Sequence, residues 1–243
     1  MIEGITERLA AVTRSFGDVL DLGCADARFM PPAGARVARC DAGFTFANRA
    51  GGVQADEDRL PFADGSFDLV VSAGVLDQVD DLPGALSLIR RVLRPDGLFL
   101  GAFIGAGSLS ALRAAMREAE GDRPAARFHP GIDVRSAGDL LVRAGFALPV
   151  ADVETLDVGY GDVGRLLGDV RGMAASNFLA QRRSITRSTL ASAAGAFAEA
   201  AQNGRTREQF RLVFLTGWAP DPGQPKAARR GSATASLAAA LRG

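Results

Sequence analysis

Hydrophobic positions along this chain follow two periods, the alternation of buried strands and the three-to-four spacing of amphipathic helices. Short apolar runs predict seven strands, at residues 18–22, 36–40, 52–55, 67–72, 98–104, 147–158 and 211–218. Helical spacing predicts helices at 2–15, 81–94, 136–144, 162–180 and 184–202, with shorter helical stretches within 43–50 and 105–127. Strands and helices alternate through the first five strands, which indicates an α/β fold with a parallel sheet and right-handed crossovers.

Two helix ends carry sequence signals of their own. Gly145 follows the helix at 136–144, at the position where a left-handed residue closes a helix. The triplet at 95–97, Pro-Asp-Gly, is expected to stop the helix at 81–94.

Chain length and composition fit one large domain. The 243 residues are 47% hydrophobic, which is enough to build a core without metals or disulfides. We expect a domain at 1–219 with helical insertions at 105–127 and 160–203. Residues 220–243 turn polar and small, and they are expected to form a surface tail.

Net charge and cysteine content favour neither a nucleic-acid-binding protein nor a secreted one. The 28 basic and 28 acidic residues cancel, so bulk electrostatics favour neither nucleic acid nor a membrane surface. Cys24 and Cys40 are expected to be buried thiols in a reducing compartment. No apolar run reaches the length of a membrane span and the N-terminus begins no secretory signal. We therefore expect a bacterial cytoplasmic protein without an integral membrane segment.

Small and acidic residues stand at the carboxyl ends of four predicted strands: Gly23, Asp41, Asp56, and the pair Ser72 and Ala73. Ligands of open parallel sheets lie at this edge. A glycine turn would allow close backbone approach, Asp41 could accept ribose hydroxyls, and Asp56 could accept from an exocyclic amine. Each has a structural alternative: a tight turn, a helix N-cap and a loop cap, respectively.

Three stretches together resemble class I S-adenosylmethionine-dependent methyltransferases: V-L-D-L-G-C at 19–24, A-D-E-D-R-L-P-F-A-D-G-S-F-D-L-V-V-S at 55–72 and V-L-R-P-D-G-L-F-L-G at 92–101. The resemblance implies a Rossmann-like fold, a seven-stranded and mostly parallel sheet whose last strand is antiparallel, with helical insertions after strands five and six. It implies S-adenosylmethionine as cofactor, with Leu60 and Phe62 against the adenine and Asp21 in the hydrogen-bond network of the site. The implied cofactor contacts are Asp21, Gly23, Cys24, Ala25, Asp41, Ala42, Asp56, Glu57, Leu60, Ser72 and Ala73.

Further stretches resemble one branch, the mitochondrial complex I assembly factor with a methyltransferase domain and its bacterial relatives. They are D-L-P-G-A-L at 81–86, R-A-G-F at 143–146, D-V-R-G-M-A-A-S-N at 169–177 and R-G-S-A-T-A-S at 230–236. The resemblance implies a protein partner in assembly of the respiratory NADH–quinone oxidoreductase and hydroxylation of an arginine on it. A sister family methylates a malonyl group on an acyl carrier protein. Arg171, Ser176 and Asn177 lie in one of these stretches and are candidate substrate or partner contacts, with capping within the fold as the alternative. Asp77 and Tyr160, the only tyrosine, are further candidates for such contacts.

Departures from the family pattern keep three functions open: an enzyme acting on a protein, a non-catalytic assembly chaperone, and a small-molecule or acyl-carrier methyltransferase. Ala25 and Ala27 replace glycines, and a positive φ at either would cost about 1 kcal/mol. The crossover at 23–35 contains Pro31 and Pro32 and leaves room for about one helical turn. Asp77 and Gln78 stand where the family has a His-Trp pair.

The histidine and cysteines of the sequence indicate neither a catalytic base nor a metal site. His129 is the only histidine, and its neighbours favour a structural or surface role over a catalytic base. One histidine and two cysteines give no metal-ligand spacing, so no metal site is expected.

Overall fold

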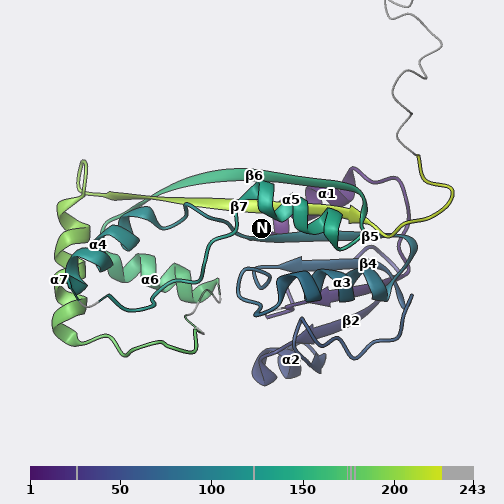
Figure 1. Cartoon of the computed structure of the whole chain (residues 1–243), viewed down its shortest axis with the longest axis horizontal. Helices are drawn as coiled ribbons and strands as arrows, with labels where there is room; N and C mark the ends of the chain where they lie inside the picture. Colours follow the sequence, from purple (N-terminus) through teal and green to yellow (C-terminus); the bar gives the residue numbers. More distant parts are fainter. Residues whose placement is uncertain (26, 123, 174, 176, 178, 226–243) are drawn as a thin grey trace, which may run out of the picture.

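A seven-stranded sheet forms the centre of the computed structural model, which describes residues 1–25, 27–122, 124–173, 175, 177 and 179–225 (Figure 1). The strand order is β3-β2-β1-β4-β5-β7-β6. Strands β1 to β5 pair in parallel, and β7 runs antiparallel to both β5 and β6. The predicted fold class is confirmed. The strands are β1 (Asp18–Leu22), β2 (Arg36–Asp41), β3 (Val53–Gln54), β4 (Phe67–Ala73), β5 (Leu93–Ile104), β6 (Ala147–Tyr160) and β7 (Thr206–Trp218).

The helices agree with the predicted positions, but α1, α3, α6 and α7 are shorter than predicted. Helix α1 ends at Ala10 because the chain then turns Phe16 into the core. Two glycines, at 168 and 172, weaken the end of α6. Thr186 starts α7 by accepting the Thr189 N–H. The helices are α1 (Ile2–Ala10), α2 (Phe44–Arg49), α3 (Leu82–Val92), α4 (Ser110–Glu120), α5 (Val134–Arg143), α6 (Val163–Gly172) and α7 (Arg187–Glu199).

Two connections differ from the sequence-based expectation. Among the described residues between β1 and β2 there is no helix, so the predicted single turn is wrong. The two prolines at 31 and 32 break the remaining length, and the Ala27 N–H closes a turn on the Cys24 carbonyl instead. Strand β5 begins directly after α3, because Asp96 and Gly97 exchange backbone hydrogen bonds with Ala219.

The sheet separates two hydrophobic clusters, as the alternating side chains of β1 illustrate: Leu20 faces one cluster and Val19 the other. Helices α3 and α5 cover the first face with side chains such as Leu86 and Leu141. Helices α1, α4, α6 and α7 contribute to the second cluster. No helix in the described part of the chain is long and apolar enough to cross a membrane.

Strands β6 and β7 continue beyond the rest of the sheet. Pairing of β5 with β7 ends at Ile104 and Leu212, whereas β6 and β7 remain paired as far as Tyr160 and Thr206. We call this two-stranded part, residues 155–160 and 206–211, the overhang. Helices α4, α6 and α7 gather around it at the left of Figure 1. The overhang therefore carries a helical cap beside the carboxyl end of β4.

Candidate functional site

The glycine turn after β1 is tightly packed by the chain itself. Gly23 has φ +75° and its N–H donates to the Cys40 carbonyl at 2.8 Å. A Cβ on Gly23 would lie 2.4 Å from Cγ1 of Val75, in the loop after β4. Glycine is thus required here by conformation and by packing, which agrees with the tight-turn alternative and leaves no open cradle on that face.

Asp41 fastens this turn to β2. Its Oδ2 accepts from the Ala25 N–H at 3.0 Å and its Oδ1 accepts from the Gly43 N–H at 2.8 Å. The carboxylate is 6% exposed. Because Gly43 is the N-cap residue of α2, Asp41 orders the residues before the helix rather than capping it. Ala42 is exposed and its carbonyl accepts from Gln54.

The altered glycine positions differ from each other. Ala27 has φ +55°, so a side chain stands where the backbone is left-handed. Ala25 is not among the described residues with positive φ. The strain foreseen for an alanine in this turn therefore falls on Ala27.

Three buried side chains lie in or beside the turn: Asp21, Cys24 and Cys40. Asp21 is 5% exposed and lies 3.5 Å from Nε of Arg39. Burial raises the pKa of the Cys24 thiol to about 11 and that of Cys40 to about 12. Both cysteines are buried and unbridged, as predicted, and neither is a reactive thiolate near neutral pH.

The acidic loop after β3 presents a different carboxyl group from the one favoured by the sequence. Asp56 is exposed, and its carbonyl accepts from the Arg59 N–H. Glu57 is buried, and that burial, with the nearby charges of Asp41 and Asp56, raises its pKa to about 7. Glu57 is therefore the acceptor held inside the fold at this edge.

Leu60 and Phe62 pack inward rather than toward the strand edge. Leu60 is 6% exposed within the first hydrophobic cluster. The Phe62 ring meets the Phe67 ring edge-on, with centroids 5.1 Å apart. Arg91 holds the loop by donating to the carbonyls of both residues. These side chains stabilise the loop and do not form an open adenine face.

At the end of β4, Ser72 is fully buried and its Oγ has no hydrogen-bond partner among the described residues. Ala73, the last residue of the strand, is partly buried. Asp41, Glu57 and Ser72 are the buried polar side chains at or just after the ends of β2, β3 and β4, the edge at which S-adenosylmethionine would bind. At the end of β1, by contrast, Val75 packs directly on Gly23 and leaves no open space on that face of the turn.

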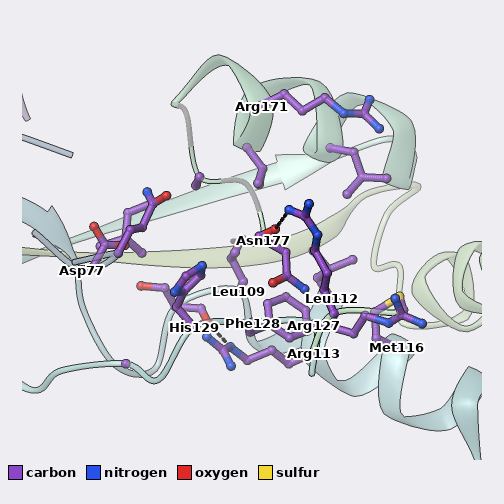
Figure 2. A pocket seen from close by; sticks show the side chains of 18 of the residues that line it. Asp77, Leu109, Leu112, Arg113, Met116, Arg127, Phe128, His129, Arg171 and Asn177 are labelled. Atoms are coloured by element: carbon purple, nitrogen blue, oxygen red, sulfur yellow. Dashed lines mark hydrogen bonds between the residues drawn. The ribbon is translucent and has the colours of Figure 1, made fainter. Parts of the chain in front are cut away.

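A cavity of about 420 Å³ lies between the loop after β4 and the helical cap (Figure 2). Its volume is in the range of small-molecule sites. It brings together three of the residues implied as substrate or partner contacts: Asp77, Arg171 and Asn177. Other side chains that the argument below uses also line it: Leu109, Leu112, Arg113, Met116, Phe128, His129, Leu167, Arg182 and Arg183.

Asp77 is the acidic group of this lining. Burial raises the pKa of its carboxyl to about 7, and Oδ1 has no partner in the described part of the chain. Gln78 beside it donates to the Gly74 carbonyl at 3.4 Å. A carboxyl in this state can donate or accept a proton near neutral pH.

The stretch after α6 is organised by Asn177. Its Nδ2 donates to the Ala126 carbonyl at 2.7 Å and its Oδ1 accepts from the Leu179 N–H at 3.0 Å. Arg171 is exposed in the last turn of α6. Ser176 lies outside the described residues. Asn177 thus serves the capping alternative while it also borders the cavity.

Tyr160, the remaining candidate for a substrate contact, lies outside the lining of this cavity. It is 6% exposed. Its hydroxyl donates to Asp169 at 2.9 Å, and its ring contacts Phe210. Burial and that hydrogen bond raise its pKa to about 12. Tyr160 therefore fixes α6 to the overhang.

Two lining residues escaped the sequence reasoning. His129 lines the cavity, although its sequence neighbours favoured a surface role. Arg113 lies in α4 between Leu109 and Met116, so a charge interrupts an apolar helix face. That interruption is a sequence signal that could have found it. Among the described residues, no group of histidine, cysteine or acidic side chains could hold a metal ion.

Comparison with known proteins finds similarity to methyltransferases and to NDUFAF5. A family model described as a methyltransferase domain matches residues 20–101. The mitochondrial arginine-hydroxylase NDUFAF5 of Danio rerio is 38% identical over 192 residues, 76% of this chain and 60% of the relative. A malonyl-[acyl-carrier protein] O-methyltransferase of Methylovorus sp. is 34% identical over 175 residues, 71% of this chain and 58% of the relative. The matches thus span less than two thirds of these relatives.

Solved structures agree on the fold. The YcgJ protein of Bacillus subtilis has a TM-score of 0.63 at 15% identity, over 90% of this chain and 98% of that one. Phosphoethanolamine N-methyltransferase 2 of Haemonchus contortus, solved with S-adenosyl-L-methionine, has a TM-score of 0.51 at 16% identity, over 90% of this chain and 52% of that one. Residues 20–101 thus match a methyltransferase domain, and the chain is similar in sequence to NDUFAF5 and in fold to these solved structures.

Proposed function

We propose that this protein binds S-adenosylmethionine at the edge formed by the Gly23 turn, Asp41 and Glu57, and acts on a partner protein in the bacterial cytoplasm. The 38% identity to an arginine-hydroxylase, NDUFAF5, supports a protein substrate. The resemblance to complex I assembly factors favours a subunit of the NADH–quinone oxidoreductase. We further propose that residues 1–219 form the functional domain and that 220–243 are a surface tail.

One observation carries this proposal: a single loop joins the cofactor edge to the cavity. Val75 packs on Gly23, and Asp77, two residues later, lines the cavity. When bound, S-adenosylmethionine would supply a methyl group on a sulfonium. Asp41 and Glu57 would accept hydrogen bonds from the adenosine, and Asp77 would hold a hydrogen-bond donor of the substrate. Catalysis would then rest mainly on orientation.

Calorimetric titration with S-adenosylmethionine and S-adenosylhomocysteine tests the cofactor site. We expect saturable binding that Glu57→Gln and Asp41→Asn weaken, because both replace buried acceptors. Asp56→Asn is the matched control, since Asp56 is exposed on the same loop. Absence of heat with either compound at millimolar concentration would contradict the proposal.

A second candidate, a non-catalytic assembly protein, is favoured by a specific observation. Both carboxylate oxygens of Asp41 already bind backbone N–H groups, and Val75 closes the turn. Such a protein would associate with complex I subunits equally well with and without the cofactor, which co-purification of wild type and Asp41→Asn would show. Deletion of 220–243 in the same assay tests whether the tail takes part.

A third candidate, an acyl-carrier methyltransferase, is favoured by the cavity. Its volume of about 420 Å³ suits a group larger than one protein side chain. The 34% identity to malonyl-[acyl-carrier protein] O-methyltransferase points the same way. Transfer of a labelled methyl group to malonyl-acyl carrier protein distinguishes this candidate from the first.

A further inference from the structure

Charge in the cavity under the helical cap is predominantly positive. Arg127 is neutralised by Glu120, whose Oε1 lies 2.6 Å from its Nε. The acidic group of the lining, Asp77, holds its proton up to a pKa of about 7. The described lining therefore offers several cations and little negative charge at neutral pH. The arginines of this lining are Arg113, Arg127, Arg171, Arg182 and Arg183.

Arg113 is held in place while part of its guanidinium stays available to a ligand. Its guanidinium carbon lies 4.4 Å from the centroid of the Phe128 ring, and its Nε donates to the Ser108 carbonyl at 3.1 Å. Neither of its Nη atoms has a hydrogen-bond partner among the described residues. Burial lowers the pKa of this guanidinium, and the nearby charge of Glu208 only partly opposes that shift. The two Nη groups are therefore partly desolvated without a hydrogen-bond acceptor among the described residues. An anion bound to the Nη atoms would supply the missing acceptors through charge-assisted hydrogen bonds.

The wall around Arg113 is apolar. Leu112 and Met116 come from α4, and Leu109 is the N-cap residue of that helix (Figure 2). Leu167 of α6 also lines the cavity. These side chains suit an aliphatic chain and offer it no hydrogen bonds. A guanidinium or ammonium ligand would meet like charges here, while an uncharged chain would leave the donors of Arg113 unused.

We propose that this cavity binds an amphipathic anion, an apolar chain ending in a carboxylate or phosphate that the Nη atoms of Arg113 receive. The inference deepens the proposed function, since it names the ligand class of the cavity beside the cofactor edge. It differs from the arginine side chain that the family resemblance implies. Ligand binding here needs no cofactor, so it can be tested separately.

Four probes with the same ten-carbon chain test the head group: decanoate, decyl phosphate, decanol and decylamine. Each is titrated into the full chain by calorimetry below its micellar concentration. We expect decanoate, decyl phosphate or both to bind saturably, and decanol and decylamine to bind at least roughly tenfold more weakly. Binding of one anion alone identifies the head group. Failure of both anions, or decylamine binding as tightly as they do, overturns the proposal.

Variants of helix α4 test the role of Arg113. Arg113→Gln should weaken the anion roughly tenfold to a hundredfold and leave decanol unchanged, because only the charged hydrogen bonds are lost. Arg117→Gln is the matched control, one turn further along and exposed. If both variants bind the anion alike, the proposal fails. Arg113→Lys keeps the charge and replaces Arg113→Gln should that variant fail to fold.

These outcomes separate this proposal from the cofactor proposal. Anion binding without S-adenosylmethionine binding supports the cavity ligand and contradicts the cofactor site. The reverse result supports the cofactor site and overturns the cavity ligand.

Discussion

Two regions at the same edge of the sheet differ in what occupies them. After β1 and β2 the chain fills the edge itself: Val75 packs on Gly23, and Asp41 binds the backbone of the turn. After β4 and β5 the helical cap stands over a cavity of about 420 Å³. The difference follows from the connections, since the first crossover is short and the later ones carry helices. The helices inserted after β5 and β6 border a cavity, whereas the short crossover after β1 leaves the edge packed by the chain.

The strongest test of the filled region is Gly23→Ala. We expect the free energy of unfolding to fall by roughly 2–5 kcal/mol, from backbone strain at positive φ and from overlap with Val75. Urea denaturation measures it. Gly51→Ala is the control, because Gly51 has φ +66° and nothing within 4 Å of the added Cβ, so only strain remains. Equal losses at the two sites would show that Val75 does not fill the turn.

Glu57 in the filled region and Asp77 in the hollow region have raised pKa values, which predict a pH dependence of stability. Glu57 and Asp77 titrate near 7 when folded and near 4 when unfolded. Between these values the folded state binds more protons, so stability falls as pH rises from about 4 to about 7. Glu57→Gln and Asp77→Asn should each remove on the order of 1–3 kcal/mol of that fall in urea unfolding. An unchanged pH slope in either variant would contradict the burial of that carboxyl.

The hollow region can be loosened without touching the cavity. Tyr160→Phe deletes the hydrogen bond to Asp169 and should lower the free energy of unfolding by about 1 kcal/mol. Because Tyr160 does not line the cavity, binding of decanoate should stay within the error of calorimetry. A large loss of binding would place Tyr160 back among the ligand contacts.

The smallest expected effect is an increase in stability. Ala27→Gly removes the side chain from a left-handed backbone and should raise the free energy of unfolding by about 0.5–1 kcal/mol in thermal melts. Ala25→Gly should not stabilise, because Ala25 is not among the residues with positive φ and glycine only adds freedom to the unfolded chain. The opposite ranking would show that the turn adopts another conformation.

The sequence patterns predicted the sheet well, but they predicted fewer of the contacts in the candidate site. Apolar runs as short as 18–22 predict strands because burial on both faces requires continuous hydrophobic residues. Gly23 and Asp41 were correctly placed at strand ends, but their present partners, Val75 and the N–H of Ala25, come from other segments. Contacts between segments far apart in the sequence leave no local pattern.

The cavity also shows that sequence predicts which residues lie near a site better than it predicts where their side chains point. Family resemblance pointed to Asp77, Arg171 and Asn177, which the fold brings around one space. Tyr160 was a candidate only because it is the single tyrosine of the sequence, and its hydroxyl donates to Asp169. Orientation of a residue at a strand end depends on the helix that follows, and no residue type reveals it.

The overhang of β6 and β7 sets a rule for resizing the cavity. Residues 155–160 and 206–211 pair with each other beyond the last pairing of β5 with β7. Side chains along a strand alternate between faces, so insertion of two residues in each strand would keep every inward side chain inward. An insertion of one would reverse them. Engineers can therefore enlarge the cap in paired steps while the pairings of β1 with β2 and β4 stay unchanged.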